Sequence, residues 1–585
     1  MVFATRLSNT SLKHCPLLVA CFTALAPSMG LGQGSLWEIQ GSSAATFFGE
    51  AVTAFGDYDG DGVVDLLVGE PGYNPGSAPE TGRIGVYSGA TQSLILSIVN
   101  SSAGVGLGCL IPPPGDLTGD AQSEILSRVY IGSSFSGRAI QVYSSTGAFL
   151  ATWPGGAGGV VGDLDGDALS DMVIGQDFWN SPWCSGDQGR AYAVSGAQGP
   201  TIMQWTGLYC APEIFGFAIA SMGDVSGDGF PDFAVSAQGL GSLPSAVWMY
   251  SGVGPSPIWV MPFYFPPIPS MVWADPMRAV GDVDEDGIED LLAGFYWAPD
   301  PGWFGANPPG VVRVLSGATG SIVHTIQGYY PNQRLGKAVA RLGDLDGDGH
   351  ADIMVGAPYG IPWFPGLSIP SGTSTLQGRV YVFSGNNGTV LLEIAEAAPW
   401  DGFGSSLDGI GDYDGDDYPD FVVGEPWRQP PNPGRIIAFS GAPSGVDVFD
   451  TGCPGSSGAM PRIAAWPSVS PGGSCAVNLS QAAVNASALL LIGSSNTSWH
   501  AAPLPFSLGT LGMPQCKLLV SPDFVFSASA SGSGPGKGHA SVTLALPGDP
   551  GLIGATFYAQ WYVVDPGPAF FPGAMTRGLA ITIQP

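Results

Sequence analysis

Acidic side chains recur in this chain in short blocks that place four carboxylates within nine residues. The first block, DYDGDGVVD, begins at Asp57 and has acids at its positions 1, 3, 5 and 9. Carboxylates this close together repel one another unless a cation lies among them. Because the block offers hard oxygen ligands and neither cysteine nor histidine, we expect it to bind Ca²⁺, or less well Mg²⁺ or Mn²⁺.

The block occurs seven times, which predicts up to seven Ca²⁺ ions, one for each block. The predicted ligands are Asp57, Asp59, Asp61 and Asp65; Asp116, Thr118, Asp120 and Glu124; Asp163, Asp165, Asp167 and Asp171; Asp224, Ser226, Asp228 and Asp232; Asp282, Asp284, Asp286 and Asp290; Asp344, Asp346, Asp348 and Asp352; and Asp412, Asp414, Asp416 and Asp420. An isolated block is also compatible with a solvated acidic turn that caps a strand, since Asp and Gly are ordinary turn residues. Repetition in register argues against that interpretation.

Two blocks depart from the pattern, and we expect them to bind a cation least well. The second has Thr118 at position 3 and Glu124 at position 9, and the fourth has Ser226 at position 3. The block resembles the first half of an EF-hand loop, but it lacks the Glu at position 12 and precedes a strand instead of a helix.

A second pattern follows each block and in most units ends in Ser-Gly, as in GRIGVYSG at 82–89 and GRIIAFSG at 434–441. Its alternation and its β-branched or aromatic content predict a strand that ends in a turn. A further apolar stretch follows, such as SLILSIV at 93–99. Each unit thus offers about four strands in about 60 residues, which is the size of a propeller blade.

The seventh unit lacks its last strand, and we expect the missing strand at the other end of the chain. SLWEIQGSSAATFFG at 35–49 has the layout of SIVHTIQGYYPNQRLG at 321–336. An N-terminal strand that completes the last blade would remove exposed strand edges. The sequence therefore predicts an all-β fold, with a seven-bladed β-propeller over residues 33–445.

Residues 446–585 contain no acidic block and are predicted to form a small β-sandwich. Short apolar strands separated by turns run through this part of the chain, such as ALLLIG at 488–493 and ATFYAQWYVVD at 555–565. Six to eight short strands in about 135 residues are typical of a sandwich.

Residues 1–32 have the outline of a secretory signal peptide. Arg6 and Lys13 precede the apolar run CPLLVACFTALA at 15–26, which is too short for a permanent membrane span. Leu18 to Cys21 also resembles a bacterial lipoprotein box, so lipid anchoring or a periplasmic location is an alternative to secretion. No other segment has 18 apolar residues in a row, and we expect a secreted or cell-surface monomer without a membrane span.

Charge and cysteine content narrow the class of protein further. The formal net charge is −30 and the sequence has no basic stripe to neutralise phosphates, so we expect no nucleic-acid partner. Export permits disulfides. Cys184 and Cys210 are one candidate pair, and at most one pair forms among Cys453, Cys475 and Cys516. The spacings do not decide which of these three cysteines pair.

The repeats resemble the FG-GAP repeats of integrin α-subunit propellers and of many secreted bacterial proteins. The FG element matches at Phe48-Gly49, Phe215-Gly216 and Phe403-Gly404, and the GAP element matches at Gly356-Ala357-Pro358. The third and fifth units lack a clear FG element. The resemblance covers residues 35–445. It implies a seven-bladed propeller with Ca²⁺ in hairpin loops on one face and ligand contacts on the opposite face.

Two features follow from resemblance alone. The Trp- and Pro-rich inserts at 296–310 and 360–372 are candidates for ligand contacts, although simple loop packing also explains them. The C-terminal part resembles a module of secreted bacterial proteins with cysteines in TGCPG and near MPQC, and this likeness favours a Cys453–Cys516 disulfide.

The functional prediction is a calcium-binding adhesion or ligand-binding protein whose ligand is an extracellular protein or a glycan. The chain has five histidines and shows no G-x-S-x-G elbow, no H-E-x-x-H motif and no phosphate loop. The alternative is an extracellular enzyme on a propeller scaffold, a polysaccharide lyase or hydrolase or a phospholipase-like protein, with its catalytic groups in the central channel. A structural part of a cell envelope is a third hypothesis.

Overall fold

The computed structural model describes the chain from residue 34 to residue 585 with gaps, and the described part consists almost wholly of β-strands. The described ranges are 34–43, 46–74, 81–100, 106–109, 111–112, 114–130, 137–179, 188–207, 214–238, 244–263, 274–298, 309–328, 333–359, 377–399, 401–428, 432–455, 458–532, 536–564 and 573–585. The only helical elements in these ranges are two short 3₁₀ turns, η1 (Gly509–Leu511) and η2 (Pro550–Leu552). Within the same ranges, no helix is long and apolar enough for a membrane crossing.

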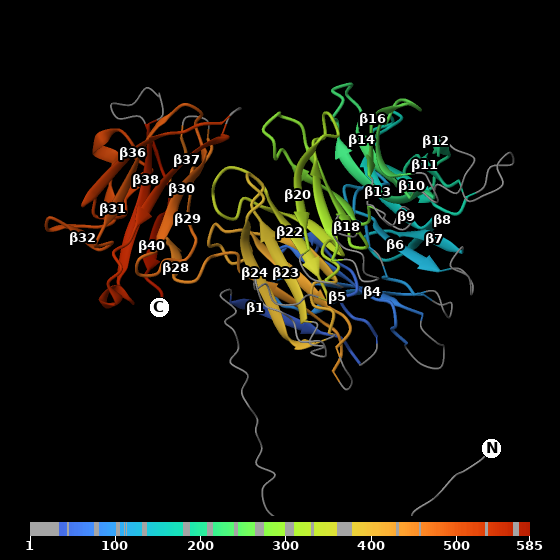
Figure 1. The fold of residues 1–585 in the computed structure, drawn as a ribbon, viewed down its shortest axis with the longest axis horizontal. Coiled ribbons are helices and arrows are strands. Elements are labelled where there is room, and N and C mark those ends of the chain that lie inside the picture. The colour runs from blue at the N-terminus through green and yellow to red at the C-terminus, as the bar shows by residue number, and fades with distance from the viewer. Residues whose placement is uncertain are drawn as a thin grey trace, which may run out of the picture. The chain divides into compact units, whose positions relative to one another are not determined.

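Between residues 35 and 439 the described strands form seven antiparallel sheets, here numbered in chain order (Figure 1). Sheet 1 consists of β2 (Val52–Gly56), β3 (Asp65–Glu70), β4 (Arg83–Tyr87) and β5 (Leu94–Val99). Sheet 2 consists of β6 (Ile125–Tyr130), β7 (Arg138–Tyr143) and β8 (Phe149–Pro154). Sheet 3 consists of β9 (Ala157–Gly162), β10 (Asp171–Gln176), β11 (Arg190–Val194) and β12 (Thr201–Thr206). Sheet 4 consists of β13 (Phe215–Gly223), β14 (Asp232–Ala237), β15 (Ser245–Ser251) and β16 (Pro257–Phe263).

The remaining three of these sheets repeat the same order. Sheet 5 consists of β17 (Met277–Gly281), β18 (Asp290–Phe295), β19 (Val311–Leu315) and β20 (Ile322–Gln327). Sheet 6 consists of β21 (Ala338–Gly343), β22 (Asp352–Ala357), β23 (Gln377–Phe383) and β24 (Val390–Pro399). Sheet 7 consists of β25 (Ser406–Gly411), β26 (Asp420–Glu425), β27 (Arg435–Phe439) and β1 (Ser35–Gln40). In sheet 2 an isolated bridge between Gly115 and Glu124 occupies the place of a first strand.

Burial decreases from the second strand of a sheet to the fourth. All six residues of β3 are buried, whereas most of β5 is exposed. A strand that is covered by neighbouring sheets on both faces is apolar along its middle, which accounts for runs such as Leu66-Leu67-Val68. The apolar runs that follow the acidic blocks are therefore the most buried strands of each sheet.

The sheets close into a ring at sheet 7. Strand β1 pairs antiparallel with β27, so the first described strand, blue in Figure 1, belongs to the same sheet as the last propeller strand. Sheets 7 and 1 also approach closely through glycine, because a Cβ on Gly424 would lie 2.2 Å from the carbonyl oxygen of Gly49. The predicted completion of the last sheet by the N-terminal strand is confirmed. The all-β propeller prediction is confirmed as a fold class, and the number of blades stays a prediction from the repeats.

The C-terminal strands form two larger sheets. One has the order β28 (Val446–Phe449), β40 (Gly578–Thr582), β38 (Thr556–Val564), β31 (Ser487–Gly493) and β36 (Phe524–Ser529), with β39 (Gly573–Met575) paired to β38. The other has the order β29 (Arg462–Trp466), β30 (Ser474–Ala482) and β37 (Gly538–Ala545). Two short hairpins are β32 (Ser498–Trp499) with β33 (Ala502–Pro503), and β34 (Phe506–Ser507) with β35 (Lys517–Leu518).

Both larger sheets contribute to one buried apolar cluster, as a sandwich requires. Val477 and Leu479 come from one sheet, and Leu490 and Trp561 come from the other, all completely buried. Since β27 ends at Phe439 and β28 begins at Val446, the predicted domain boundary at 445 falls between two sheets, and the boundary itself stays a prediction.

The disulfide favoured by the family resemblance is present, because Cys453 is bonded to Cys516. Cys475 is a buried free cysteine. Cys184 and Cys210 lie outside the described residues, as do the signal-peptide region 1–32 and most of the two Trp- and Pro-rich inserts.

Candidate metal centres

Each acidic block forms the loop between the first and second strands of its sheet; these are named loops one to seven in chain order. In loop one, β2 ends at Gly56 and β3 begins at Asp65, so position 9 of the block is the first residue of the buried second strand. Asp65 is completely buried, whereas Asp57, Asp59 and Asp61 are exposed. The sequence therefore places one carboxylate at the strand and three in the open turn.

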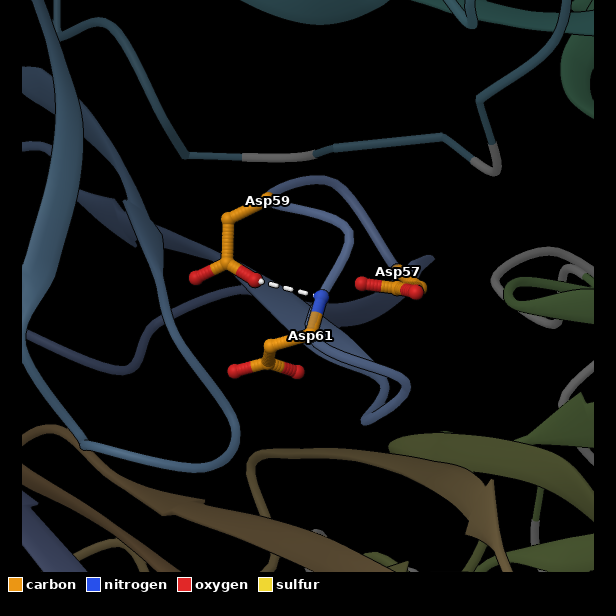
Figure 2. Close-up of side chains that lie close together, drawn as sticks. All are labelled: Asp57, Asp59 and Asp61. Atoms are coloured by element: carbon orange, nitrogen blue, oxygen red, sulfur yellow. Dashed lines mark hydrogen bonds between the residues drawn. The ribbon is translucent and has the colours of Figure 1, made fainter.

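Backbone N–H groups hold the open turn in shape. The Asp57 carboxylate accepts hydrogen bonds from the N–H groups of Gly60 (2.8 Å) and Gly62 (2.9 Å). The Asp59 carboxylate accepts one from the N–H of Asp61 at 3.2 Å, the dashed line in Figure 2. These bonds bend the backbone so that carboxylates two residues apart gather at one turn, as Figure 2 shows.

The structure brings three carboxylates together in five of the seven loops, with one oxygen from each within 4.8 Å of the others. The clusters are Asp57, Asp59 and Asp61; Asp163, Asp165 and Asp171; Asp282, Asp284 and Asp290; Asp344, Asp346 and Asp348; and Asp412, Asp414 and Asp420. Loops two and four, whose predicted ligands are all described, form no cluster of this kind. These are the two loops expected to bind least well.

Hydrogen bonds within loops two and four occupy some of the predicted ligands. Thr118 donates its hydroxyl to the Glu124 carboxylate at 3.2 Å, and the N–H of Leu117 donates to the same carboxylate at 2.6 Å. In loop four, the Ser251 hydroxyl donates to Asp228 at 2.6 Å. Equivalent bonds occur in loops that do form a cluster, such as the Leu164 N–H to Asp171 in loop three and the Ser440 hydroxyl to Asp416 in loop seven, so these bonds do not by themselves distinguish loops two and four.

The carboxylate at position 9 also binds a turn that the sequence reading did not connect to the loop. Asp65 accepts hydrogen bonds from the N–H groups of Tyr58 (2.7 Å) and Asp59 (3.1 Å), and from the N–H of Gly89 (2.9 Å). Gly89 is the last residue of the Ser-Gly pattern between the third and fourth strands. The same bond recurs from Gly196, Gly317, Gly385 and Gly441 to position 9 of their own loops. The recurrence of Ser-Gly at a fixed place in each unit was the available signal.

The donor set fits a hard divalent cation. Every predicted ligand is an oxygen, and the buried oxygens Asp282 Oδ1 and Asp344 Oδ1 have no hydrogen-bond partner. Burial raises the pKa of Asp290 to about 6, and burial together with neighbouring carboxylates raises the pKa of Asp420 to about 7. These groups resist ionisation side by side, and a cation among them would remove that penalty.

Aromatic and cationic side chains gather at the ends of the strands that lie opposite the acidic loops. The connection from a second to a third strand lies at the end away from the acidic loop, because the strands are antiparallel. There, Arg334 lies over the rings of Trp297 (4.4 Å) and Tyr359 (4.5 Å), and the Tyr359 and Trp427 rings are 5.4 Å apart. The Trp427 indole N–H donates to Glu50 at 3.0 Å. This group of five residues is called the aromatic edge below.

A small cavity opens where first strands of neighbouring sheets meet. Its lining includes Arg128, Asp275 and Arg278 together with backbone of β9 and β13. Asp275 is the single carboxylate in the described lining. The paired carboxylates that sugar hydrolysis uses are therefore not found among the residues described at this cavity.

Comparison with known proteins gives two findings. The model of the FG-GAP repeat family matches residues 48–87, 338–383 and 403–439. Integrin alpha-PS2 of Drosophila melanogaster is 36% identical over 163 residues, 25% of this chain and 11% of the relative. Integrin alpha-V of Gallus gallus is 31% identical over 221 residues, 36% of this chain and 20% of the relative. Integrin alpha-5 of Xenopus laevis is 30% identical over 172 residues, 29% of this chain and 15% of the relative. The matched part of the chain thus spans at most a fifth of the length of these relatives.

Proposed function

The chain carries FG-GAP repeats and is similar to integrin α subunits, and from this premise we propose that it is an extracellular, calcium-stabilised propeller that binds a protein or glycan ligand. The proposal places the protein in the secreted or cell-surface class and gives the propeller seven blades. It assigns one cation to each well-formed acidic loop, with the ligands named above, and no catalytic role to the chain.

The observation that carries the cation part is the fivefold repetition of a three-carboxylate cluster at one place in the sheet. A single exposed cluster is common on protein surfaces, but a loop repeated in register indicates a common physical demand. That demand is satisfied by an ion that neutralises the carboxylates and fixes the turn before each buried second strand.

The observation that supports ligand binding is the aromatic edge. Rings of Trp and Tyr with an interleaved guanidinium recognise extended ligands, through stacking on sugar rings and through cation–π contacts. The edge lies away from the acidic loops, so the loops can stabilise the propeller without contacting the ligand. The enzyme hypothesis receives no comparable support, because the described cavity offers a single carboxylate.

The cation part is tested by native mass spectrometry of residues 34–585 in millimolar calcium, with and without chelator. We expect several calcium ions bound to the untreated protein and a lower thermal midpoint after chelation. The Asp59→Asn substitution should remove one ion. If the protein binds no ion and its midpoint is unchanged by chelator, the cation part is wrong.

The ligand part is tested by retention on a panel of polysaccharides and extracellular-matrix proteins, with soluble products assayed in parallel. We expect retention without products, and its loss in Trp427→Ala. The matched control is Trp259→Ala, because Trp259 lies on the outer strand β16 with its indole N–H bonded to the Gly317 carbonyl. New products would instead favour the enzyme hypothesis. Equal retention by both variants would exclude the aromatic edge as the ligand site.

A further inference from the structure

The C-terminal sandwich covers loop six. The side-chain amide of Asn478, on β30, donates a hydrogen bond to the backbone carbonyl of Asp346 at 2.6 Å. Asn478 is 4% exposed, and Gly347 beside Asp346 is buried as well. The apolar cluster of the sandwich continues into sheet 6 through Leu345, which is completely buried. Loop six is thus part of an interface within the chain.

Loop seven takes part in the same interface. The Tyr418 hydroxyl accepts a hydrogen bond from the N–H of Ala465 at 2.8 Å, and Tyr418 is 1% exposed. Arg577, beside β40, donates to the carbonyl of Gly415 at 2.8 Å and pairs with the Asp417 carboxylate at 3.1 Å. Residues on or beside strands of both sandwich sheets therefore contact residues of acidic loops.

Loop one shows what the same sequence motif looks like without this cover. Gly60 and Gly347 occupy position 4 of their loops with nearly the same φ, +79° and +77°. A Cβ on Gly60 would meet nothing within 4 Å, whereas a Cβ on Gly347 would lie 2.6 Å from the Ala464 Cβ. The first three carboxylates are exposed in loop one and only partly exposed in loop six. The loops share their backbone and differ in what packs against them.

Two buried oxygens at this interface lack a partner. Asp344 Oδ1 in loop six and Asn478 Oδ1 in the sandwich have no hydrogen-bond partner, although both are inaccessible to water. Leaving such an oxygen unpaired in a protein interior is unfavourable. A cation in loop six would give the Asp344 oxygen, which belongs to the carboxylate cluster, a favourable electrostatic partner.

We propose that cation binding in loop six and docking of the C-terminal sandwich stabilise each other. The inference rests on the cation part of the proposed function and adds a role to one of its sites. Covering an empty loop six takes mutually repelling carboxylates out of water, whereas covering a loaded loop encloses a largely neutralised group. Loop one stays in water with or without a bound cation, because the sandwich does not cover it, and it has no such coupling. The coupling is reciprocal, so opening the interface must also weaken cation binding in loop six.

The first test is hydrogen exchange of the backbone amides in β29 and β30, on residues 34–585, in calcium and after chelation. We expect chelation to speed exchange in these strands by about tenfold or more, which is the size of effect that a typical coupling free energy produces. In calcium, Asp348→Asn should reproduce the effect, and Asp61→Asn, at the same position of loop one, should not. The wild-type comparison needs no substitution and is unaffected by any folding defect of a variant.

The second test measures the reverse direction. Gly347→Ala places a methyl group against Ala464, and Gly60→Ala imposes the same backbone strain in open space. We expect calcium titrations to show one site weakened by about tenfold or more in Gly347→Ala and a smaller change in Gly60→Ala. Asn478→Ala should weaken the same site as Gly347→Ala.

The outcomes separate the inference from the function on which it rests. If no calcium binds at any loop, the proposed function fails and the inference fails with it. If loop six binds calcium but exchange in β29 and β30 is the same with and without the ion, the coupling is refuted and the proposed function stands. Equal effects of the loop-one and loop-six variants on these strands also overturn the coupling.

Discussion

At position 9 of five acidic loops, one, three, five, six and seven, a buried carboxylate organises two turns of the backbone. In loop one, Asp65 accepts hydrogen bonds from two N–H groups of its own loop and from the N–H of Gly89 in the neighbouring Ser-Gly turn. Asp61, in the same loop, is exposed and accepts one N–H, that of Val63. The two carboxylates belong to the same residue type in the same block, but their structural roles differ. Asp65 is part of the fold even when no cation is bound.

Replacing these two carboxylates should therefore have unequal effects. In chelator, Asp65→Ala should lower the free energy of unfolding by about 3 kcal/mol or more, because it leaves three backbone donors unpaired, each costing about 1–3 kcal/mol. Asp61→Ala should cost less than about 1 kcal/mol, since water replaces the carboxylate. Urea unfolding of both variants, followed by fluorescence, measures the difference. Equal midpoints would show that position 9 acts only through the cation.

The residue types of the loops were predictable, and the partner of position 9 was not. Alternating Asp and Gly over nine residues identifies a metal-binding turn because local spacing decides which carboxylates converge. The bond from Gly89 to Asp65 joins positions 24 residues apart, through a sheet register that no local pattern encodes. The recurring Ser-Gly pair indicated a turn and nothing about its hydrogen-bond acceptor.

At the scale of elements, the outer edge of sheet 7 is where loss of one strand would allow association with another chain. Strand β1 covers β27 through five paired positions, and Glu38 binds Arg435 at 2.8 Å across the pair. Without β1, the backbone N–H and C=O groups along one side of β27 would be open to pairing with another chain.

Removing β1 should therefore cause association. A chain that starts at residue 42 should form dimers or larger aggregates and lose its sharp thermal transition, because the edge of β27 is then unpaired. A chain that starts at residue 34 keeps β1 and is the control. Size-exclusion chromatography with light scattering measures both. A monomeric chain from residue 42 would mean that the edge is protected by another element.

The C-terminal sandwich depends on its disulfide in a way that can be measured separately. Cys453 and Cys516 are 63 residues apart, so the crosslink removes about 4 kcal/mol of chain entropy from the unfolded sandwich in the loop-closure model. Reduction should lower the unfolding midpoint of the sandwich strands. Hydrogen exchange of their backbone amides measures this midpoint. The double variant Cys453→Ala/Cys516→Ala should start at the lower midpoint and not respond to reductant. A response of the double variant would point to another cysteine.

At the scale of the whole molecule, the repeat layout predicted how the ring closes but not what covers its loops. The strand missing from the seventh unit and the spare strand at 35–40 are visible in the sequence because a blade has a fixed number of strands. Loops one and six read almost alike, as DYDGDGV and DLDGDGH, and nothing local distinguishes them. Their different burial comes from residues such as Ala464, more than 100 positions away from loop six. Such contacts depend on surface complementarity, which a single sequence does not display.

The seam between sheets 7 and 1 should make the stability of the ring depend on pH through Asp408. Its carboxylate, on β25, accepts the hydroxyl of Thr53 (2.8 Å) and the N–H of Ala54 (3.0 Å), both on β2. Burial raises the pKa of Asp408 by more than these hydrogen bonds and the nearby Arg278 lower it. Over the pH range between its unfolded and folded pKa values, the folded state holds a proton that the unfolded chain has lost. The contribution of Asp408 to stability is thus greatest below its unfolded pKa, near 4, and declines as pH rises through the folded pKa.

Asp408→Asn keeps an oxygen that can accept both bonds from β2 and carries no charge. The thermal midpoint of the variant, relative to wild type, should therefore rise as pH is increased from about 4 toward neutrality and then stay constant. Both proteins have the same acidic loops, so the pH response of the loops cancels in the difference. Thr53→Val removes a donor that lowers the pKa of Asp408, so its midpoint relative to wild type should fall over this range, the opposite trend to Asp408→Asn. If the difference between Asp408→Asn and wild type does not vary with pH, the carboxylate has the same pKa in the folded and unfolded chain, and the seam is not a source of the pH dependence.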